Sequence, residues 1–94
     1  MTEERLTARI TGRVQGVGFR WWVRRHAESL RVTGWVMNAN DERSVELVAE
    51  GSARALDALE RLVRHGPSGA HVERVEARRE PASGEFDGFG IVRP

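Results

Sequence analysis

Hydrophobic and polar residues alternate along several stretches of the chain, with the period of two that is typical of half-buried β-strands. In residues 6–13, for example, Leu6, Ala8 and Ile10 alternate with arginines and threonines. Other stretches combine alternation with β-branched or aromatic residues, which strands favour. The predicted strands are residues 6–13, 32–38, 45–50 and 71–79, followed after a polar loop at 80–84 by a short strand within 86–92.

Two further stretches repeat their apolar residues every three or four positions, as the buried face of an amphipathic helix does. In residues 19–30 this stripe includes Trp22 and His26. The second helix is predicted to begin after Ser52, a residue type that caps helices, and to end at Gly66. The chain therefore alternates between strands and helices.

This order of elements predicts an α+β fold, a ferredoxin-like βαββαβ sandwich in which two helices cover one face of an antiparallel sheet and a short extra C-terminal strand follows. We expect one domain spanning residues 1–94, with a hairpin turn at residues 40–43. A helical crossover makes the first two strands run the same way, so Arg13 and Asn38 should end on one rim of the sheet. If the third strand lies between them, strand spacing puts these ends roughly 10 Å apart.

The charges of the 94-residue chain nearly cancel, because 15 arginines face 14 acidic residues for a formal net charge of +1. This balance gives no general attraction to nucleic acid or to an anionic membrane. The chain has no cysteine and no lysine, which excludes disulfides, thiolate nucleophiles and the lysine of a Walker phosphate loop. No apolar stretch approaches the roughly 20 residues of a membrane span. We therefore expect a cytoplasmic monomer whose phosphate chemistry would use arginine, backbone N–H groups or a metal.

A glycine-rich segment connects the first strand to the first helix. Residues 12–20 read Gly-Arg-Val-Gln-Gly-Val-Gly-Phe-Arg, which is neither a dinucleotide-binding nor a Walker pattern. Such a loop can point successive N–H groups into one concavity, where the helix adds the positive end of its dipole. The glycine spacing alone favours the simpler interpretation, that these residues only permit a tight turn. Arg20 favours anion binding, because a basic residue in the first helical turn opposes the dipole and a bound anion would relieve that conflict.

Two longer strings make this pattern specific. Residues 10–20, Ile-Thr-Gly-Arg-Val-Gln-Gly-Val-Gly-Phe-Arg, resemble the first signature of the acylphosphatases, and residues 34–38, Gly-Trp-Val-Met-Asn, resemble the second. The Gly66-Pro67 pair and residues 89–91 also fit, so the resemblance covers nearly the whole chain. It implies a ferredoxin-like fold and an enzyme that hydrolyses the carboxyl-phosphate bond of acyl phosphates without a metal or another cofactor.

The resemblance also implies which residues form the site. Arg20 would bind the phosphate, and Asn38 would position the attacking water. The implied partners are an acyl phosphate as substrate and inorganic phosphate as product and competitive inhibitor, with no nucleic acid and no membrane. The implied amide cradle is the loop of Gln15, Gly16, Val17, Gly18, Phe19 and Arg20.

Two positions depart from the family pattern. The family usually has a glycine four residues after Asn38, where this chain has Glu42, and Val45 arrives one residue late. We therefore expect an extra residue at the tip of the hairpin. Ser68 stands where a second proline usually follows the Gly66-Pro67 pair. Neither change touches the two side chains on which the implied chemistry depends.

Two other function classes stay open at this point. A ferredoxin-like RNA-binding module would need exposed aromatic residues near the third strand, where Ser-Val-Glu-Leu-Val-Ala-Glu has none. A catalytically silent anion-binding domain would keep the loop and lack turnover. Release of phosphate from a synthetic acyl phosphate distinguishes an enzyme from both.

Other residues offer weaker candidates for chemistry. We interpret Trp21 and Trp35 as packing residues, and Asp41 with Glu42 as a solvated turn rather than an acid/base pair. The histidines are scattered and no carboxylate pair accompanies them, so we expect no metal site. These histidines are His26, which we expect to be partly buried, His65 and His71.

Overall fold

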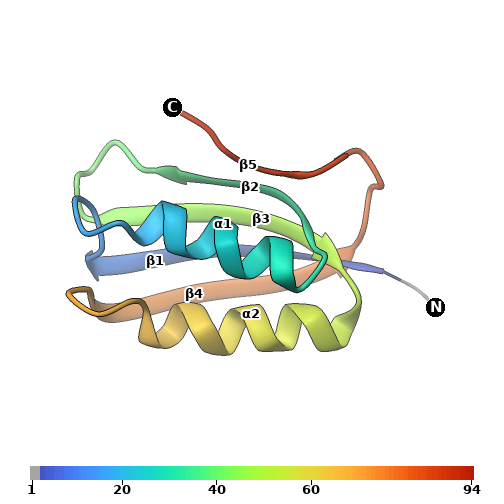
Figure 1. The fold of residues 1–94 in the computed structure, drawn as a ribbon, viewed down its shortest axis with the longest axis horizontal. Helices are drawn as coiled ribbons and strands as arrows, with labels where there is room; N and C mark the ends of the chain where they lie inside the picture. The colour runs from blue at the N-terminus through green and yellow to red at the C-terminus, as the bar shows by residue number, and fades with distance from the viewer. Residues whose placement is uncertain (1–2) are drawn as a thin grey trace.

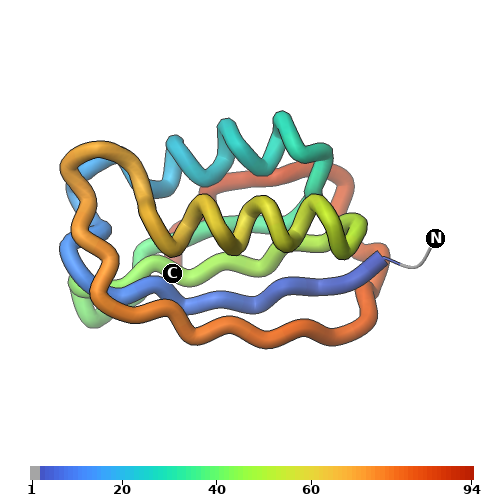
Figure 2. Tube along the Cα trace, turned by 90° about the horizontal axis from the view of Figure 1, so that it is seen from below, coloured from blue at the N-terminus to red at the C-terminus, as the bar shows by residue number. Residues whose placement is uncertain are grey.

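A computed structural model describes residues 3–94 as one five-stranded sheet with two helices packed on one of its faces (Figure 1; Figure 2). The strands confirm the predicted order of elements, and the loop between β2 and β3 spans residues 39–43. The elements are β1 (Glu4–Arg13), α1 (Phe19–Ser29), β2 (Thr33–Asn38), β3 (Ser44–Gly51), α2 (Ala53–His65), β4 (His71–Pro81) and β5 (Phe89–Ile91).

The strands lie side by side in the order β4-β1-β3-β2-β5. Strand β3 runs antiparallel between β1 and β2, as the crossover argument predicts. The antiparallel arrangement extends over four strands, but β5 pairs parallel with β2, so the complete sheet is mixed. A parallel neighbour is possible because the connection after β4 returns the chain across the end of the sheet before β5 begins (Figure 1).

Strand β4 is longer than the sequence pattern predicted. Glu80 and Pro81, placed in the polar loop by sequence, pair with Arg5 and Glu4 of β1. Because β4 is an edge strand, Pro81 can end it without removing a hydrogen bond from an interior ladder. Cross-strand pairing therefore overrides the polar composition of this segment.

The core lies between the helices and one face of the sheet. From α1 it takes Phe19, Val23 and Ala27, and from α2 it takes Leu56, Leu59 and Val63. These residues meet the alternate, inward-facing positions of the strands, which is the reason for the period of two in the sequence. The fully buried strand residues include Leu6, Ile10, Val36, Val45 and Leu47.

The two helices begin differently. The Ser52 side chain accepts a hydrogen bond of 3.1 Å from the Ala55 N–H and caps α2 as predicted, and Gly66 ends that helix. Helix α1 has Gly18 as its N-cap residue, with a left-handed backbone and no capping side chain, and its first turn contains no acidic residue. The first N–H groups of α1 are therefore left without the partners that a capped helix supplies.

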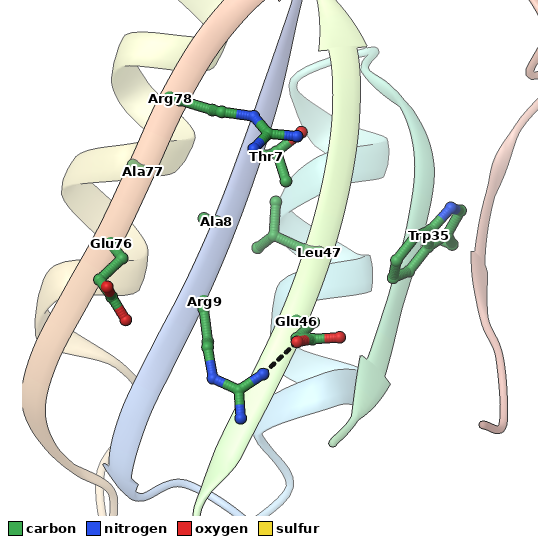
Figure 3. A pocket seen from close by; sticks show the side chains of 9 residues that line it. All are labelled: Thr7, Ala8, Arg9, Trp35, Glu46, Leu47, Glu76, Ala77 and Arg78. Carbon is green, nitrogen blue, oxygen red and sulfur yellow. Dashed lines mark hydrogen bonds and ion pairs between the residues drawn. The ribbon is translucent and has the colours of Figure 1, made fainter. Parts of the chain in front are cut away.

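The face of the sheet opposite the helices is open and carries a shallow hollow of about 410 Å³ (Figure 3). Arg9 forms an ion pair there with Glu46 of the neighbouring strand. Trp35 lines the same hollow and is half-buried, outside the core. Trp22 packs against the core as predicted, but Trp21 is 63% exposed, so its assignment as a packing residue was wrong. Its position lies off the apolar stripe of α1, which explains the exposure.

Neither helix in the described residues 3–94 is long and apolar enough to cross a membrane.

Candidate active site

The ends of β1 and β2 meet on one rim of the sheet, as the topology predicted. Ile10 and Asn38 both pair with Val45 of the intervening strand, which puts them two strand spacings, roughly 10 Å, apart. Paired residues point to the same face, and Ile10 and Val45 lie in the core. Asn38 therefore projects to the face that α1 covers. The loop into α1 and the hairpin after β2 lie at this same end of the molecule (Figure 1).

The loop between β1 and α1 is shaped by two glycines. Gly16 and Gly18 have φ angles of 74° and 78°, in the left-handed region that favours glycine. A Cβ atom at either position would meet no heavy atom within 4 Å, so the backbone conformation and not a lack of space requires glycine there. Val14, only 1% exposed, fixes the start of the loop in the core.

The backbone N–H groups of this loop are unused. Within residues 3–94, those from Gln15 to Arg20 donate no hydrogen bond to the protein. The residues alternate between left-handed glycines and other conformations before the helix, an arrangement that can turn successive N–H groups toward one anion. The helix N-terminus adds its positive dipole end at the same place. The loop is therefore a cradle of donors without an acceptor.

Arg20 lies in the first turn of α1, beside this cradle. Its side chain is half-buried and forms no ion pair with any carboxylate of the described chain, whereas Arg5, Arg9 and Arg79 each pair with acidic groups. Its charge adds to the positive end of the helix dipole, which costs stability in the absence of an anion. A guanidinium with two parallel N–H donors matches the oxygens of a phosphoryl group.

Gln15 has a second role that sequence reasoning missed. Its side-chain Nε2 donates to the carbonyl oxygens of Ala39, at 3.0 Å, and Ser44, at 2.8 Å. These two carbonyls flank the turn that follows Asn38, so Gln15 ties the loop to the hairpin. Its partners lie 24 and 29 residues away in the chain, which is why no local pattern indicated the contact.

Asn38 ends β2 with a buried polar atom that has no partner. The side-chain Oδ1 makes no hydrogen bond within residues 3–94. An unpaired buried acceptor costs on the order of 1–3 kcal/mol, so its retention needs an explanation. An acceptor and an NH₂ donor on one side chain can together orient a water molecule.

The turn after Asn38 is organised by Asp41. Its carboxylate accepts from the backbone N–H groups of Arg43 and Ser44, both at 2.9 Å, and from the Ser44 hydroxyl. The Arg43 bond is the main cause that lowers the pKa of Asp41 to about 2, with Ser44 and Arg9 adding to it. Asp41 is therefore ionised at neutral pH and serves the turn. This agrees with the interpretation of Asp41 and Glu42 as a turn rather than an acid/base pair.

Glu42, at the position where the family usually has glycine, adopts a φ of 61°. A non-glycine residue in this region is strained by about 1 kcal/mol. The hydrogen bonds of Asp41 hold the turn in this shape in spite of the side chain. Glu42 in place of the usual glycine therefore adds backbone strain at the tip of the hairpin.

The hairpin is also fastened to β1. The N–H of Gly12 donates to the Arg43 carbonyl at 3.0 Å, and the hydroxyls of Thr11 and Ser44 lie 2.9 Å apart. The β1–β4 register shifts between Thr11 and Gly12. A Cβ at Gly12 would lie 2.1 Å from the His71 carbonyl oxygen, so only glycine allows this approach.

The histidines do not gather at the rim. His26 is half-buried, with its ring 4.7 Å from the ring of Trp22 in an edge-on contact, as expected of a structural residue. His65 and His71 are exposed on either side of the α2–β4 loop. Across residues 3–94 no group of three or more His, Asp or Glu side chains is placed to hold a metal ion.

Comparisons with known proteins agree with the geometry. The Acylphosphatase family model matches residues 6–91. The acylphosphatase of Salinibacter ruber is 52% identical over 92 residues, covering 98% of this chain and 96% of the relative. That of Paenarthrobacter aurescens is 50% identical over 94 residues, covering 98% and 99%. The solved structure of an acylphosphatase from Coxiella burnetii superimposes with a TM-score of 0.90 at 34% identity, covering 97% of this chain and 94% of that one.

Proposed function

The chain belongs to the acylphosphatase family and is an enzyme that hydrolyses acyl phosphates, and we propose that Arg20 and the loop from Gln15 to Arg20 bind the phosphoryl group while Asn38 orients the attacking water. The observation that carries this proposal is the coincidence of unused polar groups on one rim. Within residues 3–94, N–H donors without a protein acceptor, an arginine without an ion pair and a buried amide oxygen without a partner lie at the ends of adjacent elements.

The binding step uses donors alone. The three outer oxygens of the phosphoryl group accept from the loop N–H groups and from the Arg20 guanidinium, which together replace its hydration shell. The left-handed Gly16 and Gly18 and the buried Val14 shape the loop so that these donors lie together at the N-terminus of α1. Charge that builds on the phosphoryl oxygens during the reaction meets the same donors.

The chemical step is the attack of water on phosphorus. A bond forms between the water oxygen and phosphorus, the bond from phosphorus to the carboxyl oxygen breaks, and the carboxylate leaves with the bonding electrons. The proton lost by the water passes to the phosphate product or to solvent. A carboxylate is a good leaving group, so the reaction requires chiefly that water be held in line. Asn38 Oδ1 is a buried acceptor able to hold it and too weak a base to deprotonate it early.

Arg20→Ala tests the binding half of this proposal, and the chain offers a matched control. Arg20 is the second residue of α1 and Arg54 is the second residue of α2, where Ser52 already caps the helix. We expect Arg20→Ala to lower the affinity for inorganic phosphate and kcat/KM by roughly a hundredfold or more, the scale of a lost charged contact. Arg54→Ala should change neither.

The measurement is the competitive inhibition constant of inorganic phosphate, read beside the turnover of a synthetic acyl phosphate. Circular dichroism should show that Arg20→Ala keeps the fold, because the side chain contributes nothing to the core. An Arg20→Ala enzyme that binds phosphate as the unchanged protein does would move the anion site elsewhere.

A further inference from the structure

The exposed face of α1 carries a groove that begins at the phosphate loop. The groove, of about 570 Å³, is lined by Val17 and Gly18 of the loop and, from the helix, by the exposed Trp21 and Arg25 and by Trp22, which also packs against the core. Pro67 from the α2–β4 loop closes one side. The groove-lining helix positions recur every three or four residues, so they form one stripe that runs roughly 15 Å along α1 from Gly18 to Glu28.

Trp21 is the unexplained residue of this stripe. Its side chain is 63% exposed, while the other large apolar side chains of α1 face the core. The Arg24 guanidinium lies over the indole ring, 5.6 Å from its centroid, and also forms an ion pair of 3.5 Å with Glu28. This contact restricts the ring on the helix surface. A restrained, exposed indole next to a binding loop is suited to contact an apolar or aromatic group.

We propose that Trp21 contacts the acyl group of the substrate and makes the enzyme prefer acyl phosphates with aromatic or bulky apolar acyl groups. This inference rests on the proposed function, because it takes the phosphoryl group to lie in the cradle from Gln15 to Arg20. The acyl carbon is then separated from phosphorus by a single oxygen, so the acyl group must lie against residues at the edge of the cradle. Val17 and Gly18 belong to both the cradle and the groove, which makes Trp21 the first large side chain beyond the loop.

The charges of the groove agree with this assignment. Glu28 is engaged by Arg24, whereas Arg25 is exposed and has no ion pair in the described part of the chain. The groove therefore has no free carboxylate that would repel the carboxylate released in the reaction. Trp21 does not touch the reacting atoms, so it is a specificity residue and its removal should leave the cradle intact.

The test compares two synthetic substrates, acetyl phosphate and benzoyl phosphate, on the unchanged enzyme and on Trp21→Ala. The readout is the ratio of kcat/KM for benzoyl phosphate to that for acetyl phosphate. We expect Trp21→Ala to lower this ratio about tenfold, through loss of an aromatic contact, with acetyl phosphate turnover and phosphate inhibition changed less than twofold. Trp21→Phe should keep most of the ratio, since an aromatic ring is retained.

Trp35→Ala supplies a matched control, because this tryptophan lies on the opposite, open face of the sheet (Figure 3). It should leave the ratio unchanged. An unchanged ratio in Trp21→Ala, including an equal loss with both substrates, would overturn the proposal. Failure of the proposed function would give a different result. In that case Arg20→Ala would retain turnover with both substrates, whatever the ratio of kcat/KM values in the Trp21 variants.

Discussion

Two polar side chains at opposite ends of the sheet, Glu50 and Asn38, differ in whether their buried oxygens have partners. At one end Glu50, only 3% exposed, accepts hydrogen bonds from the Arg5 guanidinium, the Ser83 hydroxyl and the backbone N–H groups of Ser83 and Gly84. At the other end the buried side-chain oxygen of Asn38 has no hydrogen-bond partner within residues 3–94. In the same part of the chain the more exposed loop N–H groups from Gln15 to Arg20 donate no hydrogen bond to the protein.

The difference distinguishes a polar group that stabilises the fold from polar groups that are available to a substrate. Burial alone would raise the pKa of Glu50, but the bonds from Ser83, Gly84 and Arg5 outweigh it and lower the pKa to about 2. The satisfied carboxylate fastens the connection that leads from β4 to β5. The Asn38 oxygen and the loop N–H groups make no hydrogen bond within residues 3–94, which is the arrangement expected where a substrate completes the set of hydrogen bonds.

Replacing Glu50 should give the largest loss of stability. Glu50→Ala leaves Arg5 Nε and the backbone N–H groups of Ser83 and Gly84 without their acceptor. We expect the free energy of unfolding to fall by about 3 kcal/mol, the cost of breaking a buried ion pair from one side. Urea denaturation measures it. A free energy of unfolding within about 0.5 kcal/mol of the unchanged protein would show that the hydrogen bonds of Glu50 do not stabilise this end of the sheet.

The same carboxylate should make the fold sensitive to acid. Its pKa is about 2 in the folded protein and ordinarily 4.5, so its stabilising effect is present above pH 4.5 and lost as the pH falls toward 2. Glu50→Gln should flatten the fall of stability across this range. Asp41, whose folded pKa is also about 2, contributes in a similar range, so Asp41→Asn is the matched variant at the rim. Denaturant titrations between pH 5 and about 2 compare them.

Gln15→Ala should have an intermediate effect, because it unties the loop from the hairpin. The variant loses two hydrogen bonds to the Ala39 and Ser44 carbonyls, worth about 1–2 kcal/mol together. We expect kcat/KM to fall about tenfold as the cradle and Asn38 lose their fixed separation. Gln15→Glu, which points a carboxylate at the two carbonyls, should be at least as damaging. Full activity in both variants would show that the tie does not position the site.

The smallest effect is expected from the two strained residues, one at each end. Glu42 in the hairpin and Arg31 between α1 and β2 have φ angles of 61° and 59°. Glycine at either position removes about 1 kcal/mol of backbone strain from the folded state. It also raises the conformational entropy of the unfolded chain, which offsets about half of this gain in stability. Glu42→Gly and Arg31→Gly should each raise the stability by about 0.5 kcal/mol. Thermal unfolding would contradict this if either variant melted below the unchanged protein.

Much of the fold could be predicted from the sequence because it is encoded locally. The alternation in β1 and the stripes of both helices follow directly from which faces are buried, and the crossover rule placed Arg13 and Asn38 on one rim. The extension of β4 to Pro81 could not be predicted, since it depends on pairing with Glu4 across the sheet. The parallel addition of β5 likewise depends on the path of the connection before it.

The prediction of the candidate site rested on the glycine-rich loop, on Arg20 and on the family resemblance, which supplied the role of Asn38. Its long-range contacts were not, because the Gln15 side chain meets its partners only after the chain has folded. The exposure of Trp21 could have been inferred, since it lies off the apolar stripe that contains Trp22. The sequence could not predict that the buried Asn38 oxygen has no partner within residues 3–94, because this depends on how the surrounding residues pack in the folded protein.

The kinetics of Asn38→Ala test most directly whether the unsatisfied groups at the rim divide the work of binding and catalysis. Turnover of a synthetic acyl phosphate should fall about a hundredfold, on the order of 3 kcal/mol, because the water loses its alignment. The competitive inhibition constant of inorganic phosphate should stay within about twofold, since Arg20 and the loop N–H groups remain. Near-normal turnover, or a collapse of phosphate affinity in parallel with turnover, would contradict the account.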